Sequence, residues 1–235
     1  MRSLIVMAMF VATLSNAAWN GYTETRDLEL SADGVQLLNI DAGAGSIAVN
    51  GDGNETDIKV KAIIRVSDDV KDAKKIIEKD LILKLEKIRD RAVLDAYFDH
   101  NIWHFGGSAA VDLEVQIPQG LAIFIDDGSG PMTIEDVGGE VGVDDGSGSI
   151  TVSGAASVEV DDGSGSITIS GITGDVMVED GSGDITIRNV GGTVTIDDGS
   201  GGIDVEDVEH DLDIVDDGSG SVQLSDIRGS VYQHD

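Results

Sequence analysis

The sequence contains no cysteine, only two prolines and few aromatic residues, which make up 4% of its 235 positions. Without cysteine the chain cannot form a disulfide, bind a metal through thiolates or use a cysteine nucleophile. Scarce aromatic and proline residues favour a long, narrow core of small aliphatic side chains over an ordinary globular core.

Basic residues are also scarce, with 15 Lys and Arg against 45 Asp and Glu, which gives a net charge of −30. Only two basic residues follow position 118, against 26 acidic ones. Such a surface repels nucleic acid and anionic lipid. We therefore expect no nucleic-acid binding and expect cations, or proteins with basic surfaces, as partners.

Long hydrophobic runs are missing as well. Residues 1–18 contain Arg2, a short apolar run and then small residues up to Ala18, which is the pattern of a secretory signal peptide. The apolar run is too short to span a bilayer. The sequence thus predicts an exported protein, periplasmic, on the cell surface or secreted, without membrane insertion.

What the chain has in abundance is a repeat. An acidic pair followed by Gly-Ser-Gly occurs six times, at 126–130, 144–148, 161–165, 179–183, 197–201 and 216–220. The first glycines of the copies are separated by 18, 17, 18, 18 and 19 residues. A fixed period of this kind indicates stacked supersecondary units.

One unit is represented by residues 157–174. Apolar and polar residues alternate around Val158 and Val160 before the Gly-Ser-Gly, and around Ile167 and Ile169 after it, which predicts two half-buried strands joined by a glycine corner. Stacked units would bury these side chains in one continuous core. The fold class predicted is all-β, a right-handed parallel β-helix (solenoid) with about 18 residues per turn, the hand following from the general crossover rule. A third apolar column would fill the far corner: Val137, Ala155, Ile172, Val190, Val208 and Ile227.

The repeat divides the chain. Residues 119–235 form the regular β-solenoid of six acidic Gly-Ser-Gly turns, and residues 19–118 are expected to be an irregular β region that caps its first edge. Residues 38–49 align with the repeat and represent its first turn, with Asp41 at the first acidic position and Ala42 at the second. Ser67 is a candidate N-cap for a short helix over 68–79, in which acidic residues come early and lysines late.

The acidic pairs are the candidate functional residues. Because side chains alternate along a strand, the two acids of a pair face opposite sides. The first acids point outward and stack into a charged ladder: Asp126, Asp144, Asp161, Glu179, Asp197 and Asp216. The second acids face the core valines: Asp127, Asp145, Asp162, Asp180, Asp198 and Asp217. The second acids can accept hydrogen bonds from the corner backbone. All twelve are also candidate calcium ligands, since calcium prefers several carboxylate oxygens.

No catalytic motif accompanies the repeat. A Gly-x-Ser-x-Gly elbow and a phosphate-binding loop are both missing. The alternating Val/Ile pattern, the acid and the Gly-Ser-Gly corner over residues 37–230 resemble the bacterial envelope β-helix proteins that bear the name adhesin without an established function. The resemblance implies a β-helix and no catalytic residues; the uniform double acids of this chain depart from it. We therefore expect a non-enzymatic interaction scaffold for cations, an envelope protein or a glycan. A calcium-binding structural repeat protein is the alternative, and a carbohydrate-active β-helix enzyme the third possibility.

Overall fold

The computed structural model describes residues 21–67, 72–99 and 108–234. Within these ranges the chain is all-β, with two ten-stranded sheets and one short helix, α1 (Ala73–Asp80). In spatial order, sheet A contains β1 (Gly21–Ser31), β4 (Asp57–Ser67), β7 (Ala109–Pro118), β3 (Ile47–Asp52), β9 (Met132–Glu135), β11 (Ile150–Ser153), β13 (Ile167–Ile172), β15 (Ile185–Val190), β17 (Ile203–Val208) and β19 (Val222–Ile227). In the same direction, sheet B contains β5 (Leu81–Ile88), β6 (Arg91–Phe98), β2 (Leu37–Ala44), β8 (Ala122–Ser129), β10 (Glu140–Asp145), β12 (Ser157–Asp162), β14 (Val176–Asp180), β16 (Val194–Asp198), β18 (Leu212–Asp216) and β20 (Val231–Gln233).

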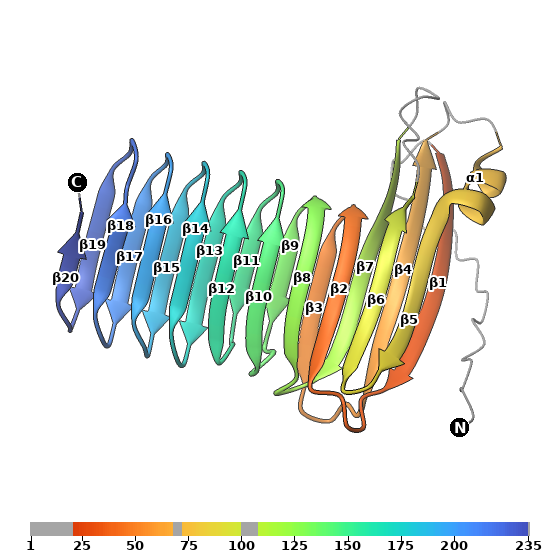
Figure 1. Cartoon of the computed structure of the whole chain (residues 1–235), viewed down its shortest axis with the longest axis horizontal. Coiled ribbons are helices and arrows are strands. Elements are labelled where there is room, and N and C mark those ends of the chain that lie inside the picture. Colours follow the sequence, from red (N-terminus) through yellow and green to blue (C-terminus); the bar gives the residue numbers. More distant parts are fainter. Residues whose placement is uncertain (1–20, 68–71, 100–107, 235) are drawn as a thin grey trace.

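From β8 onward, successive strands alternate between the two sheets (Figure 1). Each of these strands pairs in parallel with the strand two positions along the chain; Val158 of β12, for example, lies between Val141 of β10 and Val176 of β14. A strand of sheet B, its Gly-Ser-Gly corner and the next strand of sheet A form one rung. The rungs stack into the elongated body that Figure 1 shows from the side.

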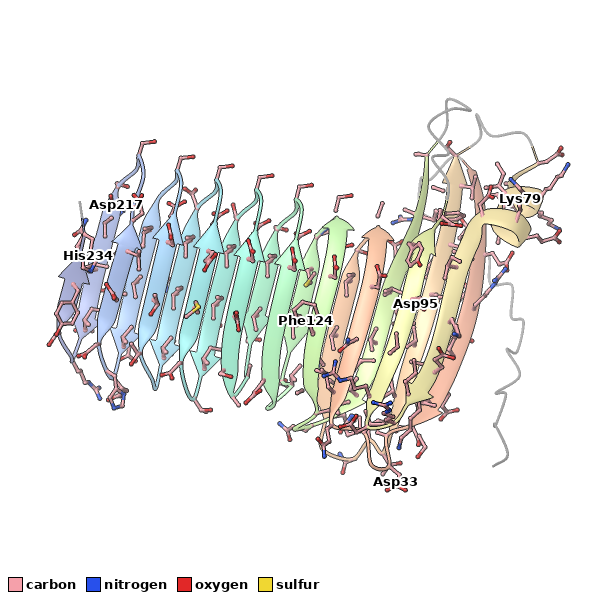
Figure 2. All side chains as sticks on the ribbon, in the orientation of Figure 1. Asp33, Lys79, Asp95, Phe124, Asp217 and His234 are labelled. Carbon is pink, nitrogen blue, oxygen red and sulfur yellow. The ribbon has the colours of Figure 1, made fainter. Side chains whose placement is uncertain are left out.

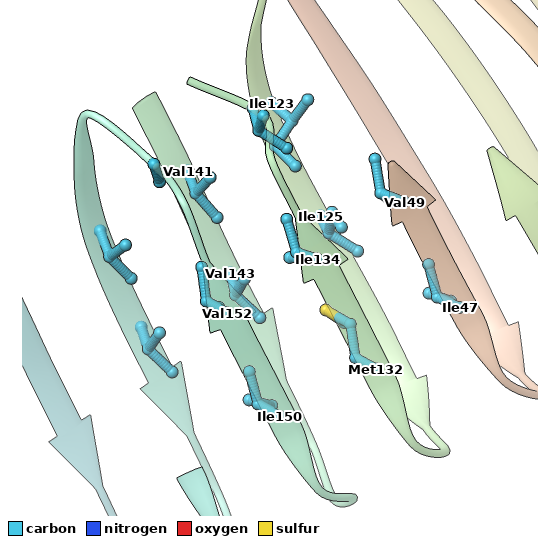
Figure 3. Close-up of a cluster of buried hydrophobic side chains, with 14 of the residues drawn as sticks. Ile47, Val49, Ile123, Ile125, Met132, Ile134, Val141, Val143, Ile150 and Val152 are labelled. Atoms are coloured by element: carbon cyan, nitrogen blue, oxygen red, sulfur yellow. The ribbon is translucent and has the colours of Figure 1, made fainter. Parts of the chain in front are cut away.

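The core lies between the sheets and consists of the side chains that the alternation assigns to it. Val158, Val160, Ile167 and Ile169 are all at most 3% exposed, as are their equivalents in the neighbouring rungs (Figure 3). The predicted third column is buried as well, except that Ile227 is only partly buried. Full burial of each Val or Ile stabilises the fold by roughly 1.5–3 kcal/mol relative to an exposed side chain. The predicted core of the repeat is thereby confirmed.

The N-terminal strands do not stack in sequence order. β2 pairs in parallel with β6 on one side and β8 on the other, and β3 pairs with β7 and β9. The turn that aligns with the repeat over residues 38–49 is therefore enclosed between a later rung, β6 with β7, and the regular array. The predicted alignment of residues 38–49 with the repeat is confirmed, since Leu38 and Ile40 lie beside Ile123 and Ile125, and Ile47 and Val49 beside Met132 and Ile134. Although this turn is first in the chain, it is not first in the stack.

The first edge of the stack is built differently from the rest. β1 pairs antiparallel with β4, β4 antiparallel with β7, and β5 antiparallel with β6. Polar side chains also point inward at this edge, where the guanidinium of Arg26 contacts the carboxylate of Glu24 at 2.7 Å. Inward charges and antiparallel turns interrupt the repeat and block further strand addition, as an edge requires.

The helix begins later than the sequence predicts. Ser67 is the last residue of β4, and its hydroxyl accepts a hydrogen bond from the Ser108 N–H (2.9 Å) instead of capping a helix. The residue before α1 is Asp72, which has left-handed backbone angles (φ 62°, ψ 49°), so the helix starts at Ala73. Residues 68–71 of the predicted helix and the predicted signal peptide, 1–18, lie outside the described residues. Within α1, Ile77 is buried, and Ala73 and Ile76 are half-buried against the core. In the described ranges no helix has the length and apolar character needed to cross a membrane.

Candidate functional site: two columns of stacked acids

The acidic pairs form two columns because the strands of sheet B are in register. Five of the predicted outward acids are direct neighbours on adjacent strands: Asp126, Asp144, Asp161, Glu179 and Asp197. Five of the predicted inward acids are neighbours in the same way: Asp127, Asp145, Asp162, Asp180 and Asp198. We call the first set, with the additions described next, the outer ladder, and the second set the inner column. Sequence reasoning assigned all ten of these residues to the correct side.

The outer ladder is longer than the repeat. Asp41 of β2 lies beside Asp126, and Asp95 of β6 lies beside Asp41. At the other end Asp216 lies beside Asp197. Eight carboxylates therefore follow one line along the outer face of sheet B. At the start of this line, Lys84 of β5 lies opposite Asp95 in the strand register. The position of Asp41 was visible in the alignment of residues 38–49, but Asp95 precedes no Gly-Ser-Gly and carried no sequence signal.

Repulsion between neighbours makes the ladder a strongly negative line. At the strand spacing of about 4.8 Å, two unit charges repel by roughly 0.9 kcal/mol in bulk water and by several times more near a low-dielectric surface. The effect is visible at Asp41, where partial burial and the nearby charges of Asp126 and Asp95 raise the pKa of the carboxyl group. A positive partner that binds along this line would relieve the repulsion.

The inner column has the backbone partners that the sequence predicted. One carboxylate oxygen of the second acid accepts the N–H of the serine two residues later, as in the pairs Asp145–Ser147 (3.2 Å) and Asp162–Ser164 (3.0 Å). Asp180 and Asp198 make the same bond at 3.0 Å. This contact holds the Gly-Ser-Gly corner closed from inside. Asp127 occupies the equivalent place; the backbone N–H groups of Ser129 and Gly128 act to lower its pKa against the larger effect of burial, but neither carboxylate oxygen forms a hydrogen bond of normal geometry.

The second oxygen of each inner carboxylate has no partner. The Oδ2 atoms of Asp145, Asp162, Asp180 and Asp198 are buried without a hydrogen bond, and the five side chains are between 0% and 5% exposed. A carboxylate in that position loses its hydration, so burial raises the pKa, to about 7 for Asp127 and about 6 for Asp145 and Asp180. Repulsion between neighbours adds to the shift. The inner column is therefore a line of acids that burial favours in the protonated form.

The glycines allow the corners to stack in direct contact. The second glycine of each corner lies against the backbone of the preceding corner; a Cβ placed on Gly183 (φ +156°) would lie 1.5 Å from the carbonyl oxygen of Gly165. The Gly183 N–H in turn donates to the Ser200 carbonyl oxygen of the following corner (3.0 Å). Any side chain at this position would separate the rungs. Figure 2 shows the side chains over the whole stack.

The sixth copy departs from the other five. Val215 is an extra residue in β18, and the register with β16 shifts between Ile196 and Asp197. This shift keeps Asp216 beside Asp197, and the next residue, Asp217, lies near Asp198, whose pKa is raised by burial and by the Asp217 charge. Asp217 is half-buried, unlike the five buried inner acids, and its Oδ2 accepts a hydrogen bond from the side-chain amide of Gln233 (2.8 Å). Asp216 accepts the Gly218 N–H (2.8 Å). That Asp217 faces the core stays a prediction.

An acid of the outer ladder and an acid of the inner column cannot coordinate one calcium ion together. The acids of one pair point to opposite sides of sheet B, so they cannot bind the same ion. Among the described residues no group of three or more His, Cys, Asp or Glu side chains is arranged to hold a metal ion. Calcium usually takes six to eight oxygen ligands. Calcium binding at the twelve predicted acids stays a prediction that requires ligands from neighbouring rungs, backbone carbonyls or water.

Comparison with known proteins gives several solved structures of low similarity, two of which are described here. No family model matches the chain. No curated protein sequence matches it either. One similar solved structure is a "putative cell adhesion protein" from Clostridium sporogenes, with 11% identity and a TM-score of 0.34, covering 90% of this chain and 98% of that one. Another is a "putative lipid binding protein" from Parabacteroides distasonis, with 13% identity and a TM-score of 0.45, covering 92% and 95%. At these TM-scores neither similarity bears on the function of this chain.

Proposed function

We propose that this protein is a non-enzymatic, exported, adhesin-like interaction scaffold, a right-handed β-solenoid of about 18 residues per turn whose acidic face binds cationic partners. The observation that supports it is the outer ladder, in which eight carboxylates lie on one face of a rigid, parallel stack. The export signal, residues 1–18, would deliver that face to the periplasm, the cell surface or the medium. There the partners would be free cations or the basic groups of an envelope protein or glycan.

The rigidity of the ladder is part of the proposal. Each carboxylate is fixed to a strand that pairs on both sides, so a cationic chain meets charges that are already aligned, and little ordering is needed on binding. Electrostatic attraction of this kind raises the association rate and weakens steeply with salt. On the corresponding line of sheet A, the neutral residues Thr133, Thr151, Thr168 and Thr186 lie in register and are followed by Asp204, whose carboxylate forms an ion pair with Arg188 (2.9 Å). The two faces therefore differ in charge, and the partner should bind to sheet B.

A binding experiment with a charge-matched control tests this function. The probe is a dye-labelled octalysine, and the measurement is its fluorescence anisotropy at several NaCl concentrations. Replacing Asp126, Asp144 and Asp161 with Asn should weaken binding at least tenfold at low salt. The control replaces three acids on the outer face of sheet A, Glu135→Gln, Asp204→Asn and Glu206→Gln, and should leave binding nearly unchanged. Equal losses in both variants would show that net charge alone, and not the ladder, attracts the probe.

Calcium binding is the second candidate, supported by the unpartnered Oδ2 atoms of the inner column. An ion bound by the folded state alone raises the melting temperature in proportion to the logarithm of its concentration. The melting temperature is measured in 5 mM CaCl2 and then in excess chelator, with ionic strength held constant by NaCl. An unchanged melting temperature would remove calcium from the proposal. Release of reducing or unsaturated sugars from a polysaccharide panel would instead overturn the non-enzymatic assignment.

A further inference from the structure

A groove lies on the outer face of sheet B beside the outer ladder. It has a volume of about 820 Å³ and extends over the strands from β2 to β16. Its floor is the line of outward residues two positions before the ladder acids, among them Phe124, Gly142, Glu159 and Met177. Ladder and groove are therefore adjacent lines on the same strands, about 7 Å apart.

Two large apolar side chains are exposed in the floor of the groove. Phe124 is 40% exposed and Met177 is 44% exposed, although both are large hydrophobic side chains. Gly142 lies between them in the same line, and a Cβ at that position would be 2.9 Å from Cδ2 of Phe124. The Phe124 ring thus lies against the bare backbone of Gly142, in the place that a side chain there would take. We call the part of the groove floor from this ring to Met177 the hollow. Figure 2 labels Phe124 on this face.

The charges around the groove are mostly negative. The outer ladder borders one side, Glu140 and Asp175 line the other, and Glu159 lies in the floor; Arg91 is the basic residue among the lining side chains. An anionic ligand would meet repulsion along its whole length. An apolar ligand without charge would leave these acids without a counter-charge, so the occupant must combine positive charge with apolar groups.

We propose that the groove binds an extended peptide segment of a partner protein in which basic and apolar side chains alternate. The six strands from β2 to β16 span about 24 Å at a spacing of about 4.8 Å, a length that seven extended residues of about 3.3 Å cover. Side chains of an extended segment alternate between its two edges. One edge then places three or four basic groups over the outer ladder, and the other places apolar groups against Phe124, Met177 and the hollow at Gly142.

This inference rests on the proposed function and adds to it the class of partner and the place of binding. Inorganic cations and polyamines would contact the outer ladder alone, so their affinity should not depend on Phe124 or Met177. A segment with alternating basic and apolar residues uses both lines at once. The apolar contacts also resist salt, so part of the affinity should persist at ionic strength that screens exposed charges.

Two dye-labelled nonapeptides test the inference by fluorescence anisotropy in 0.15 M NaCl: one alternates Lys and Leu, the other Lys and Ser, with five lysines each. The Lys/Leu peptide should bind at least tenfold more tightly to the wild-type protein. Phe124→Ala with Met177→Ala should abolish that difference and leave Lys/Ser binding unchanged. The matched control is Tyr232→Ala, which removes an exposed aromatic side chain on the same face but outside the groove, and should change neither affinity.

A second variant fills the hollow without removing an apolar side chain. Gly142→Ala places a Cβ against the Phe124 ring, so it should also reduce the preference for the Lys/Leu peptide. Equal binding of the two peptides to the wild type would overturn the inference but not the proposed function. Failure of both peptides to bind would overturn both. Tighter, Phe124-dependent binding of a cationic glucosamine oligomer would replace the peptide by a polysaccharide.

Discussion

Neutralising one residue of the inner column should stabilise the protein at neutral pH and do little in acid. Asp145 is 2% exposed, one of its oxygens accepts the Ser147 N–H, and the other has no partner. Burial raises the pKa of this carboxyl group from 3.8 to about 6. Asn at this position keeps an oxygen for the Ser147 N–H and carries no charge at any pH.

The magnitude follows from the difference between the folded and unfolded pKa values. Because the folded pKa of Asp145 is raised, its contribution favours folding below about pH 4 and is lost as the pH rises through about 6. The unfolded carboxyl group is already more than half ionised at pH 4, so pKa values of 3.8 and about 6 correspond to a loss of about 2 kcal/mol between pH 4 and pH 7.5. The Asp145→Asn variant lacks that loss, so its free energy of unfolding should exceed that of the wild type by about 2 kcal/mol more at pH 7.5 than at pH 4.

The assay is urea unfolding followed by circular dichroism at half-unit steps from pH 4 to pH 8, in 0.5 M NaCl. At that salt concentration the exposed ladder is screened, whereas the buried site is not. The control is Asp144→Asn, the exposed neighbour on the same strand, whose difference from the wild type should stay below about 1 kcal/mol at every pH. Parallel pH profiles for the wild type and Asp145→Asn would refute the assignment of a charge penalty to the inner column.

Three further substitutions test the stacking of the rungs, each by thermal and urea unfolding. Gly183→Ala should prevent native stacking or cost several kcal/mol, because its Cβ would overlap the Gly165 carbonyl oxygen; a change below 1 kcal/mol would contradict the contact between corners. Gly171→Asn should be nearly neutral, since Asn189 holds the equivalent left-handed conformation (φ 56°) in the neighbouring rung, and a loss above about 2 kcal/mol would speak against that equivalence. Ile169→Ala should cost about 2–5 kcal/mol through the cavity it leaves in the core; a cost typical of surface sites, within about 0.5 kcal/mol, would mean that Ile169 is not enclosed.

Much of the regular array was predictable because two sequence periods occur together there: the two-residue alternation along each strand and the repeat of about 18 residues. Alternation along each strand assigns residues such as Val160 and Ile167 to the core, and the spacing of the Gly-Ser-Gly corners repeats that assignment rung after rung. The same alternation placed Asp145 inward and Asp144 outward. The last step of 19 residues shows that the sixth copy has an extra residue, but the sequence did not show that the register shifts between Ile196 and Asp197, which keeps Asp216 beside Asp197.

The stacking order of the N-terminal strands could not be read in this way. Alternation tells which face of β2 is buried but not which strands lie beside it, since any strand with the same alternation can pair with it. For that reason the enclosure of β2 between β6 and β8 was not foreseen, nor the entry of Asp95 into the outer ladder. The alignment of Phe124, Gly142 and Met177 follows from the repeat, since each lies two positions before an acid of the outer ladder, but the sequence did not show how far these side chains are exposed.

The sequence by itself determined the all-β class, the inner and outer sides of each repeated strand and the burial of five acids beside the corners. These properties depend on residues close together in the chain, where backbone geometry fixes the direction of every side chain. Only the tertiary structure decided which strands are neighbours, how far the outer ladder extends and where an apolar hollow opens beside it. Those features depend on backbone pairing between distant segments, which many sequences with the same alternation could satisfy in more than one order.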